Sequence, residues 1–155
     1  MHEKFFNDTI AKYGDTVLRV ATSITGNLTE AEDVFSDVFF VLWQSKKDFE
    51  SEEYLKAWLI RVAINKAKNQ KRLASNRYNV ELNEAIAASK DKEVISDIDE
   101  AMSRLEDVEK AILYLHYFEG YSFVEIAKMM DLPDATVRSK AKRAREAMKE
   151  FLSEE

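Results

Sequence analysis

The stretch that decides the fold is SFVEIAKMMDLPDATVRSKAKRAREAM, residues 122–148. Its apolar residues recur at helical spacing on both sides of Asp131-Leu132-Pro133, a tripeptide typical of a turn. The pattern predicts two helices, from Ser122 to about residue 130 and from Asp134 to about residue 152, that pack as a helix-turn-helix. The residues expected on their inner faces are Ile126, Ala127, Met130, Val137, Ala141, Ala144 and Met148.

The outer positions of the second of these helices have the composition of a DNA-recognition helix. Small or polar residues come first, where base edges would be read, and Arg and Lys follow, where phosphates would be held. Segment 135–149 carries six basic residues and one acidic residue. The alternative is an ordinary helical hairpin with a basic, solubilising face. The candidate DNA-binding residues are Thr136, Arg138, Ser139, Lys140, Lys142 and Arg143.

A second basic segment, residues 54–78, carries seven Lys or Arg residues and no acid. The spacing predicts a helix over 52–74, capped by Ser51, with Leu55, Leu59, Val62 and Ala63 on its inner face. One flank combines cations that hold phosphates, amides that read base edges and an aromatic ring that stacks on unpaired bases. The alternative is a solvated basic face. The candidate residues are Trp58, Arg61, Asn65, Lys68, Asn69 and Arg72.

A helix predicted over 30–46, with Thr29 and Glu32 as a capping box, is apolar over too wide an arc for a single core. One explanation is a helix wedged between two others, which would account for Phe35, Phe39 and Trp43. The remaining face has Phe40 among polar neighbours, which favours a surface for a protein partner. That face holds Asp33, Asp37, Phe40 and Gln44.

The rest of the chain completes an all-α prediction. A helix over 4–25 ends at Gly26-Asn27, apolar helical spacing resumes from Ile98 and Met102 to residue 115, and Gly120 ends it. Three Gly and one Pro are too few for the turns of an all-β fold. The prediction is two small helical domains, residues 1–74 and 101–155, joined by a flexible linker at 75–100, with the helix-turn-helix in the second domain.

Composition excludes several classes of function. Zero Cys excludes disulfides and thiolate metal sites, and two His leave little room for a metal centre. There is no Gly-rich phosphate loop and no catalytic cluster, so we expect no enzyme activity, no metal and no cofactor. No apolar run of about 18 residues occurs, so no membrane insertion is expected. The net charge of −6 conceals the two basic segments.

At this point the chain resembles an extracytoplasmic-function (ECF) sigma factor, the smallest type of bacterial RNA polymerase sigma subunit. The resemblance covers nearly the whole chain outside 75–100. The stretches that carry it are ITGN at 24–27, EAEDV at 30–34, DVF at 37–39, LW at 42–43, LKAWLIRVAIN at 55–65, YFEGYS at 117–122, EIA at 125–127, TVRS at 136–139 and RAR at 143–145.

The resemblance implies a cytoplasmic bacterial protein that binds core RNA polymerase, through the clamp of the largest subunit and the flap, and promoter DNA. A partner anti-sigma factor is also implied. Leu42 and Trp43 would join Asp33 and Asp37 on the polymerase-binding helix. The candidate residues from Trp58 to Arg72 would bind the minus-ten element, and the recognition helix would bind the minus-thirty-five element. Two rivals stay open: a stand-alone helix-turn-helix regulator with a helical sensor domain, and a helical adaptor that binds only protein.

Overall fold

The structure, a computed structural model, describes residues 2–88 and 105–153 and is all-α over those residues. The predicted fold class is confirmed. Positions 98 and 102 and the linker residues 89–100 lie outside the described residues. The elements are α1 (His2–Thr25), α2 (Leu28–Gln44), α3 (Glu52–Ala88), α5 (Asp107–Leu113), the π-helical turn η1 (Tyr114–Phe118), α6 (Phe123–Met130) and α7 (Asp134–Ser153).

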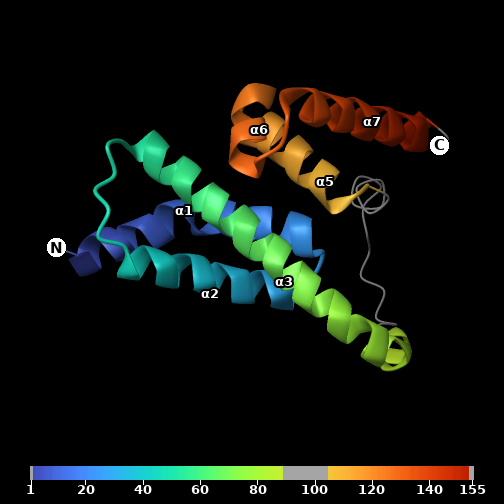
Figure 1. Ribbon diagram of the computed structural model, residues 1–155, viewed down its shortest axis with the longest axis horizontal. Helices are drawn as coiled ribbons and strands as arrows, with labels where there is room; N and C mark the ends of the chain where they lie inside the picture. The colour runs from blue at the N-terminus through green and yellow to red at the C-terminus, as the bar shows by residue number, and fades with distance from the viewer. Residues whose placement is uncertain (1, 89–104, 154–155) are drawn as a thin grey trace.

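Helices α1, α2 and α3 form the N-terminal module, in which α1 and α2 run antiparallel and α3 crosses both (Figure 1). Val17, Val20 and Val34 are fully buried between them. Complete burial of such side chains contributes about 1.5–3 kcal/mol each. Gly14 allows the close approach of α1 to α2, because a Cβ atom there would lie 3.3 Å from Cε2 of Phe35.

The N-terminus of α2 differs from the prediction. Asn27, not Thr29, is the N-cap, and its side chain accepts a hydrogen bond from the Glu30 backbone N–H at 3.1 Å. Asn caps a helix at least as well as Thr. Gly26 precedes it with φ +70°, which ends α1 as expected from glycine in the left-handed region.

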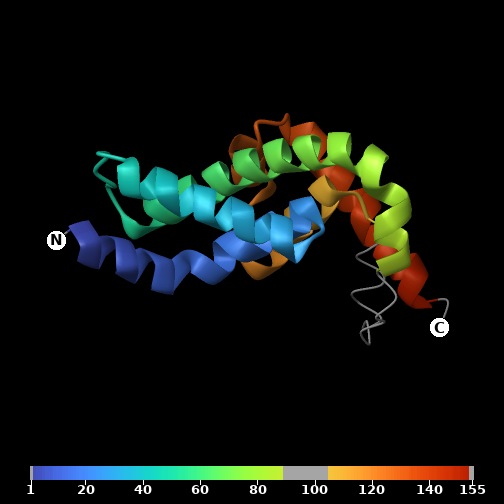
Figure 2. The ribbon, with the colours of Figure 1, turned by 90° about the horizontal axis from the view of Figure 1, so that it is seen from below.

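Helix α3 begins as predicted, with Ser51 Oγ accepting from the Tyr54 N–H at 3.1 Å. It continues beyond the predicted end at residue 74 to Ala88 and runs past the bundle, as Figure 2 shows. Its buried surface is also wider than predicted, since Ile60 and Ile64 are fully buried along with Leu59. The reason is that α3 packs against α1 and α2 and also against α6.

The C-terminal module consists of α5, η1, α6 and α7. Ser122 and Glu125 form a capping box at the start of α6, in which each side chain accepts a hydrogen bond from the other residue's backbone N–H. Asp131 follows α6 in the left-handed conformation, with φ 56° and ψ 48°, and turns the chain into α7. The predicted helix-turn-helix is confirmed. Its predicted inner positions are buried or half-buried: Ile126, Ala127, Met130, Val137, Ala141, Ala144 and Met148.

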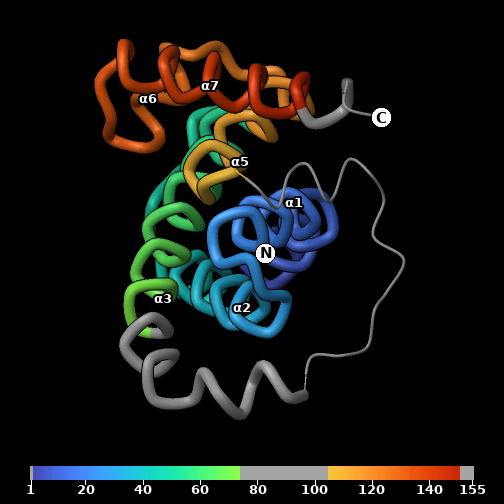
Figure 3. The backbone as a smooth tube through the Cα atoms, turned by 90° about the vertical axis from the view of Figure 1, so that its right-hand side faces the viewer, coloured from blue at the N-terminus to red at the C-terminus, as the bar shows by residue number. Residues whose placement is uncertain are grey.

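The two modules are in direct contact. One continuous cluster of buried apolar side chains runs from α1, α2 and α3 into α5, α6 and α7. The contacts between the modules join α1 to α5 and η1, and α3 to α6. Figure 3 shows α6 and α7 as a layer over one side of the three-helix bundle.

Candidate nucleic-acid and protein interfaces

The outer face of α2 presents an exposed aromatic ring beside two carboxylates. Phe40 is 59% exposed, and Asp33, Asp37 and Gln44 are also exposed. Neither aspartate side chain forms an ion pair or hydrogen bond with any other residue that the structure describes. An exposed phenylalanine contributes little to the core, so this face has the composition of a docking surface.

The neighbouring residues on α2 divide between core and surface. Phe39 and Leu42 are each 3% exposed, and Phe35 is half-buried, so the wedged-helix interpretation holds for the two phenylalanines. Leu42 lies in the core, on the side of α2 that faces away from Phe40. Trp43 is 44% exposed at the end of the helix. It is held there by His2, whose ring centroid lies 4.5 Å from that of Trp43.

One side of α3 carries the predicted candidate residues, termed the α3 stripe: Trp58, Arg61, Asn65, Lys68, Asn69 and Arg72. Arg61, Asn65, Asn69 and Arg72 are exposed, while Lys68 and Trp58 are partly buried. Arg72 Nη2 donates to Asn69 Oδ1 at 2.7 Å. None of the stripe's Lys or Arg side chains forms an ion pair with a carboxylate in the described part of the chain. Within the described residues, the positive charge of the stripe is therefore not neutralised by a carboxylate.

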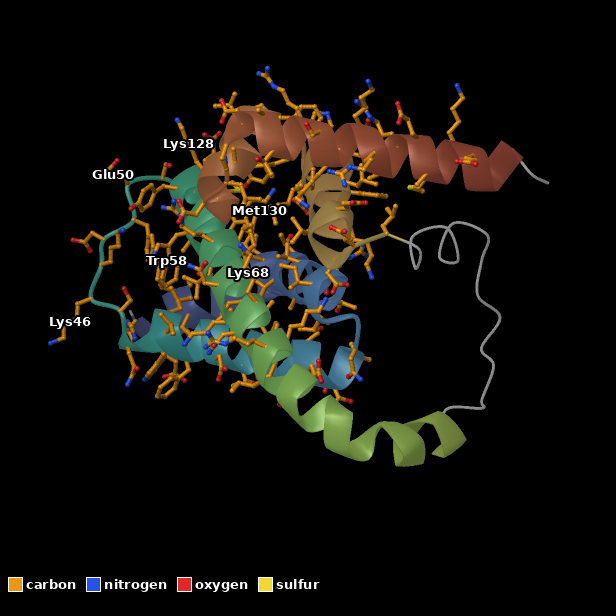
Figure 4. The ribbon with its side chains drawn as sticks, turned by 45° about the vertical axis from the view of Figure 1, so that its right-hand side comes forward. Lys46, Glu50, Trp58, Lys68, Lys128 and Met130 are labelled. Atoms are coloured by element: carbon orange, nitrogen blue, oxygen red, sulfur yellow. The ribbon has the colours of Figure 1, made fainter. Side chains whose placement is uncertain are left out.

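Two stripe cations instead reach the C-terminal module. Arg61 Nη2 donates to the backbone carbonyl of Lys128 at 2.7 Å, and Lys68 Nζ donates to that of Met130 at 3.2 Å. Both carbonyls belong to the last turn of α6. Figure 4 labels Lys68 on α3 and Met130 on α6 next to each other. It also labels Trp58, which lies at the N-terminal end of the stripe. Sequence reasoning missed this pairing, because a backbone acceptor carries no residue-type signal.

A groove of about 900 Å³ lies between the two modules beside this contact. Trp58 and Arg61 line it from α3, Lys128 from α6, and Glu119 and Tyr121 from the loop between η1 and α6. Tyr121 is partly buried there, and burial, with the charges of Glu119 and Glu125, raises its pKa to about 12. Its hydroxyl is therefore neutral at physiological pH.

Glu119 connects three helices. Its carboxylate pairs with Lys56 of α3 at 2.6 Å and accepts from the Tyr114 hydroxyl at 2.7 Å and from Thr16 of α1 at 3.4 Å. Burial alone would raise the pKa of this carboxyl group, but the hydrogen bonds from Lys56 and Tyr114 and the Lys56 charge outweigh it. The pKa of Glu119 is therefore lowered, and its carboxyl group is ionised at neutral pH. This contact too was missed, because Lys56 and Glu119 are 63 positions apart in the sequence.

The loop between α2 and α3 is fixed by an aromatic cluster that the sequence did not reveal. Phe49 is half-buried and packs edge-on against Trp58 at 5.1 Å between ring centroids. The ring of Phe5 in α1 also stacks with that of Phe49, with 6.3 Å between centroids, and the Tyr54 ring lies 6.1 Å from Phe49. The first turn of α1 thereby sets the position of the loop next to the stripe.

The recognition helix α7 presents its predicted residues outward. Arg138, Ser139, Lys142 and Arg143 are exposed, and Thr136 is partly buried. Lys140 is the member with a carboxylate partner, since its Nζ lies 3.4 Å from Glu106 Oε2. The described residues contain no group of three or more His, Cys, Asp or Glu side chains that could hold a metal ion.

Comparisons with known proteins agree with this arrangement of a helical bundle followed by a helix-turn-helix. Residues 9–77 match the family described as Sigma-70 region 2, and residues 95–148 match Sigma-70, region 4. The class defined by the fold and its surfaces is therefore the RNA polymerase sigma factor. Within that class the chain belongs to the ECF sigma factors, as the resemblance predicted.

The curated relatives match along most of their length. The RNA polymerase sigma-H factor of Pseudomonas aeruginosa is 28% identical, covering 97% of this chain and 87% of the relative. The ECF RNA polymerase sigma-E factor of Haemophilus influenzae is also 28% identical, over 93% of this chain and 85% of the relative. The ECF RNA polymerase sigma factor SigW of Bacillus subtilis is 22% identical over 95% of this chain and 88% of the relative. These relatives favour the sigma-factor interpretation over the stand-alone regulator and the adaptor.

Solved structures show the same fold. The sigma factor RpoE from Bartonella quintana, in complex with the anti-sigma factor NepR, matches with a TM-score of 0.72 at 22% identity, covering 97% of this chain and 98% of that one. CnrH, in complex with the cytosolic domain of CnrY, matches with a TM-score of 0.67 at 22% identity, covering 99% of this chain and 90% of CnrH.

The chain is thus an alternative sigma factor, which binds core RNA polymerase and directs promoter recognition and transcription initiation. Proteins of this family are transcription initiation factors and are not known as enzymes. Among residues 2–88 and 105–153, none of the helices has the length and apolar character that crossing a membrane requires.

Proposed function

We propose that the outer face of α2 is the surface that binds the clamp of the polymerase largest subunit. The contacts would come from Phe40 and Trp43, with Asp33, Asp37 and Gln44 providing orientation, while Leu42 anchors α2 in the core. A buried aromatic anchor supplies most of the binding energy at such interfaces, and the charges around it select the partner. The observation that supports this role is a 59% exposed phenylalanine on the same helix face as two carboxylates that have no partners in the described part of the chain.

The α3 stripe is proposed to bind the melted minus-ten element. Its Lys and Arg side chains pair with no carboxylate among residues 2–88 and 105–153, Asn65 is exposed, and the Trp58 ring is partly exposed for base stacking. Residues 1–74 would form the functional unit for polymerase binding and melting, and the proposed linker spans 75–100. The proposed boundary at residue 74 divides the chain by function and not by secondary structure, because α3 continues to Ala88.

The recognition helix α7 is proposed to read the minus-thirty-five element from residues 101–155. Exposed Arg138, Ser139, Lys142 and Arg143, with Thr136 and Lys140, would lie in the major groove or against its phosphates. This module would also contact the polymerase flap. An anti-sigma partner is proposed by similarity to RpoE, whose solved structure contains the anti-sigma factor NepR. The polymerase it serves would place the protein in the bacterial cytoplasm.

The test is transcription in vitro with core polymerase on a template carrying the region upstream of this protein's own gene. We expect a defined transcript that appears only when both core polymerase and the protein are present. A chain that bound this DNA tightly and specifically without polymerase, and gave no transcript with it, would contradict the proposed function.

A further inference from the structure

The loop between α2 and α3, residues 45–51, is held in place by side chains rather than by its backbone. Figure 4 shows Lys46 and Glu50 on this loop with their side chains directed away from the bundle. Within the part of the chain that the structure describes, the backbone of 46–50 forms no hydrogen bond with another element. A cavity of about 700 Å³ lies between the loop and the first turn of α1. A segment with so few backbone bonds depends on its packed side chains for a fixed position.

The N-terminal half of α1 contacts this loop at its start, its middle and its end. The contacts are those of His2 with Trp43, of Phe5 with Phe49, and of Tyr13 with Glu52. The first two bring ring centroids to 4.5 Å and 6.3 Å, and in the third the Tyr13 hydroxyl donates to Glu52 Oε2 at 2.5 Å. Because these α1 residues are three and eight positions apart, they share one face of the helix. That face of α1 therefore braces the loop along its length.

The middle contact leads directly to the α3 stripe. Phe49 is the half-buried aromatic residue of the loop, and its ring packs edge-on against Trp58 at 5.1 Å between centroids. Phe5 is 41% exposed, so much of its ring lies outside the core. Aromatic pairs prefer defined relative orientations, so Phe5 restricts Phe49 and Phe49 restricts Trp58.

We infer that Phe5 is a positioning residue for promoter melting, which acts through Phe49 to fix the orientation in which Trp58 stacks on an unpaired base. This inference rests on the proposed minus-ten role of the stripe. A ring that is already held in its binding orientation loses less conformational freedom when the base stacks on it. Helix α1 is thus the third part of the melting surface, beside α3 and the loop, although Phe5 itself does not contact the DNA.

The experiment compares Phe5→Ala with Phe5→Tyr, which keeps the aromatic ring. Each variant is combined with core polymerase on the template of the transcription test above, and gel shifts and permanganate footprinting follow closed-complex formation and opening. We expect Phe5→Ala to reduce opening by about 5-fold, which corresponds to about 1 kcal/mol for one aromatic pair. Closed-complex formation by Phe5→Ala and both steps in Phe5→Tyr should stay within about 2-fold of the parent.

A double-variant comparison shows whether Phe5 acts through Trp58. In a Trp58→Ala chain, Phe5→Ala should reduce opening no further, because residues that act as one unit are not additive. A template with mismatched strands over the minus-ten element should restore transcription by Phe5→Ala, since its defect lies in opening. A shortage of folded protein would not be restored in this way.

The position of the Trp58 ring can be followed in the free protein. The chain has two tryptophans, so a Trp43→Phe background leaves Trp58 as the sole fluorescent tryptophan. Acrylamide quenching of Trp58 in that background should rise in Phe5→Ala and stay unchanged in Phe5→Tyr. Circular dichroism and a thermal melt establish folding, and Phe5→Leu, which keeps an apolar contact without a ring, replaces Phe5→Ala if that variant is unfolded.

The outcomes separate this inference from the proposed function. Normal opening by Phe5→Ala together with a defect in Trp58→Ala overturns the positioning role and leaves the minus-ten assignment in place. Additive defects, or a defect that persists on the mismatched template, also overturn it, because Phe5 then acts by another route. Normal opening by a folded Trp58→Ala chain overturns both the role of Trp58 and the inference.

Discussion

Two adjacent phenylalanines on α2 should respond to alanine substitution in opposite ways. Phe40 is 59% exposed and Phe39 is 3% exposed. A phenylalanine buries up to about 200 Å², so Phe40 has on the order of 120 Å² still available to a partner. At about 25 cal/mol per Å², burial of that area contributes about 3 kcal/mol, or roughly a 100-fold change in Kd.

Phe40→Ala should therefore weaken the binding of core polymerase by up to about 100-fold, with a free energy of unfolding within about 0.5 kcal/mol of the parent. Phe39→Ala should cost about 3–5 kcal/mol of stability, because it leaves a cavity in the core. Adding Asp37→Arg to Phe40→Ala should abolish co-purification with core polymerase. The measurements are urea unfolding by circular dichroism and a binding titration of labelled protein with core polymerase.

The reasoning is refuted by either of two results. A loss of stability above about 2 kcal/mol in Phe40→Ala would mean that the ring belongs to the core. Unchanged polymerase affinity in the double variant would mean that the interface lies elsewhere on the molecule. Phe39→Ala serves as the reference for a core loss, since it lies on the same helix, one position away.

The remaining predictions concern the two promoter surfaces and the turn between them. Arg143→Ala should weaken closed-complex formation by roughly 1–3 kcal/mol if Arg143 reads a base, whereas Asn65→Ala should impair strand opening more than closed-complex formation. Gel shifts measure the first step and permanganate footprinting measures the second. Identical defects of both variants in both assays would contradict the separate roles of the two surfaces. Asp131→Gly should raise the free energy of unfolding by up to about 1 kcal/mol, because φ 56° suits glycine better; an unchanged or lower urea midpoint would count against it. The lowered pKa of Glu119 means that its ionised form stabilises the interface above the unfolded-state pKa of about 4.3 and that this stabilisation is lost as pH falls through the folded-state value. Trp58 quenching in the Trp43→Phe background should rise over that acidic window, and a flat profile would exclude Glu119 as the titrating group.

Apolar spacing of 3.6 residues was sufficient to predict the helices that bury one clear face. It placed α1 and the helix-turn-helix within a few residues, because Gly26 and the sequence Asp131-Leu132-Pro133 end their helices where the backbone turns. It ended α3 too early. Residues 75–88 lose the apolar pattern but contain no Gly or Pro, so nothing in the backbone ends the helix there.

The residue types in the sequence were enough to predict the two surfaces, but not the contacts that their side chains make within the chain. The stripe could be found from the absence of acids over 54–78, and the face of Phe40 from its polar neighbours. The contacts of Arg61 and Lys68 could not be found, because their acceptors are main-chain oxygens of a distant helix. Long-range pairing of this kind depends on how the modules pack, which periodicity within one helix does not encode.

The π-helical turn η1 makes the C-terminal module sensitive to the length of the chain at this point. The Glu119 N–H bonds to the Tyr114 carbonyl five residues back, so η1 contains one residue more than an α-helical turn and displays Phe118 at 76% exposure. Removing one residue would restore α-helical winding and rotate everything that follows by about 100°. The turn thus acts as an angular spacer, and relatives should tolerate few insertions or deletions here.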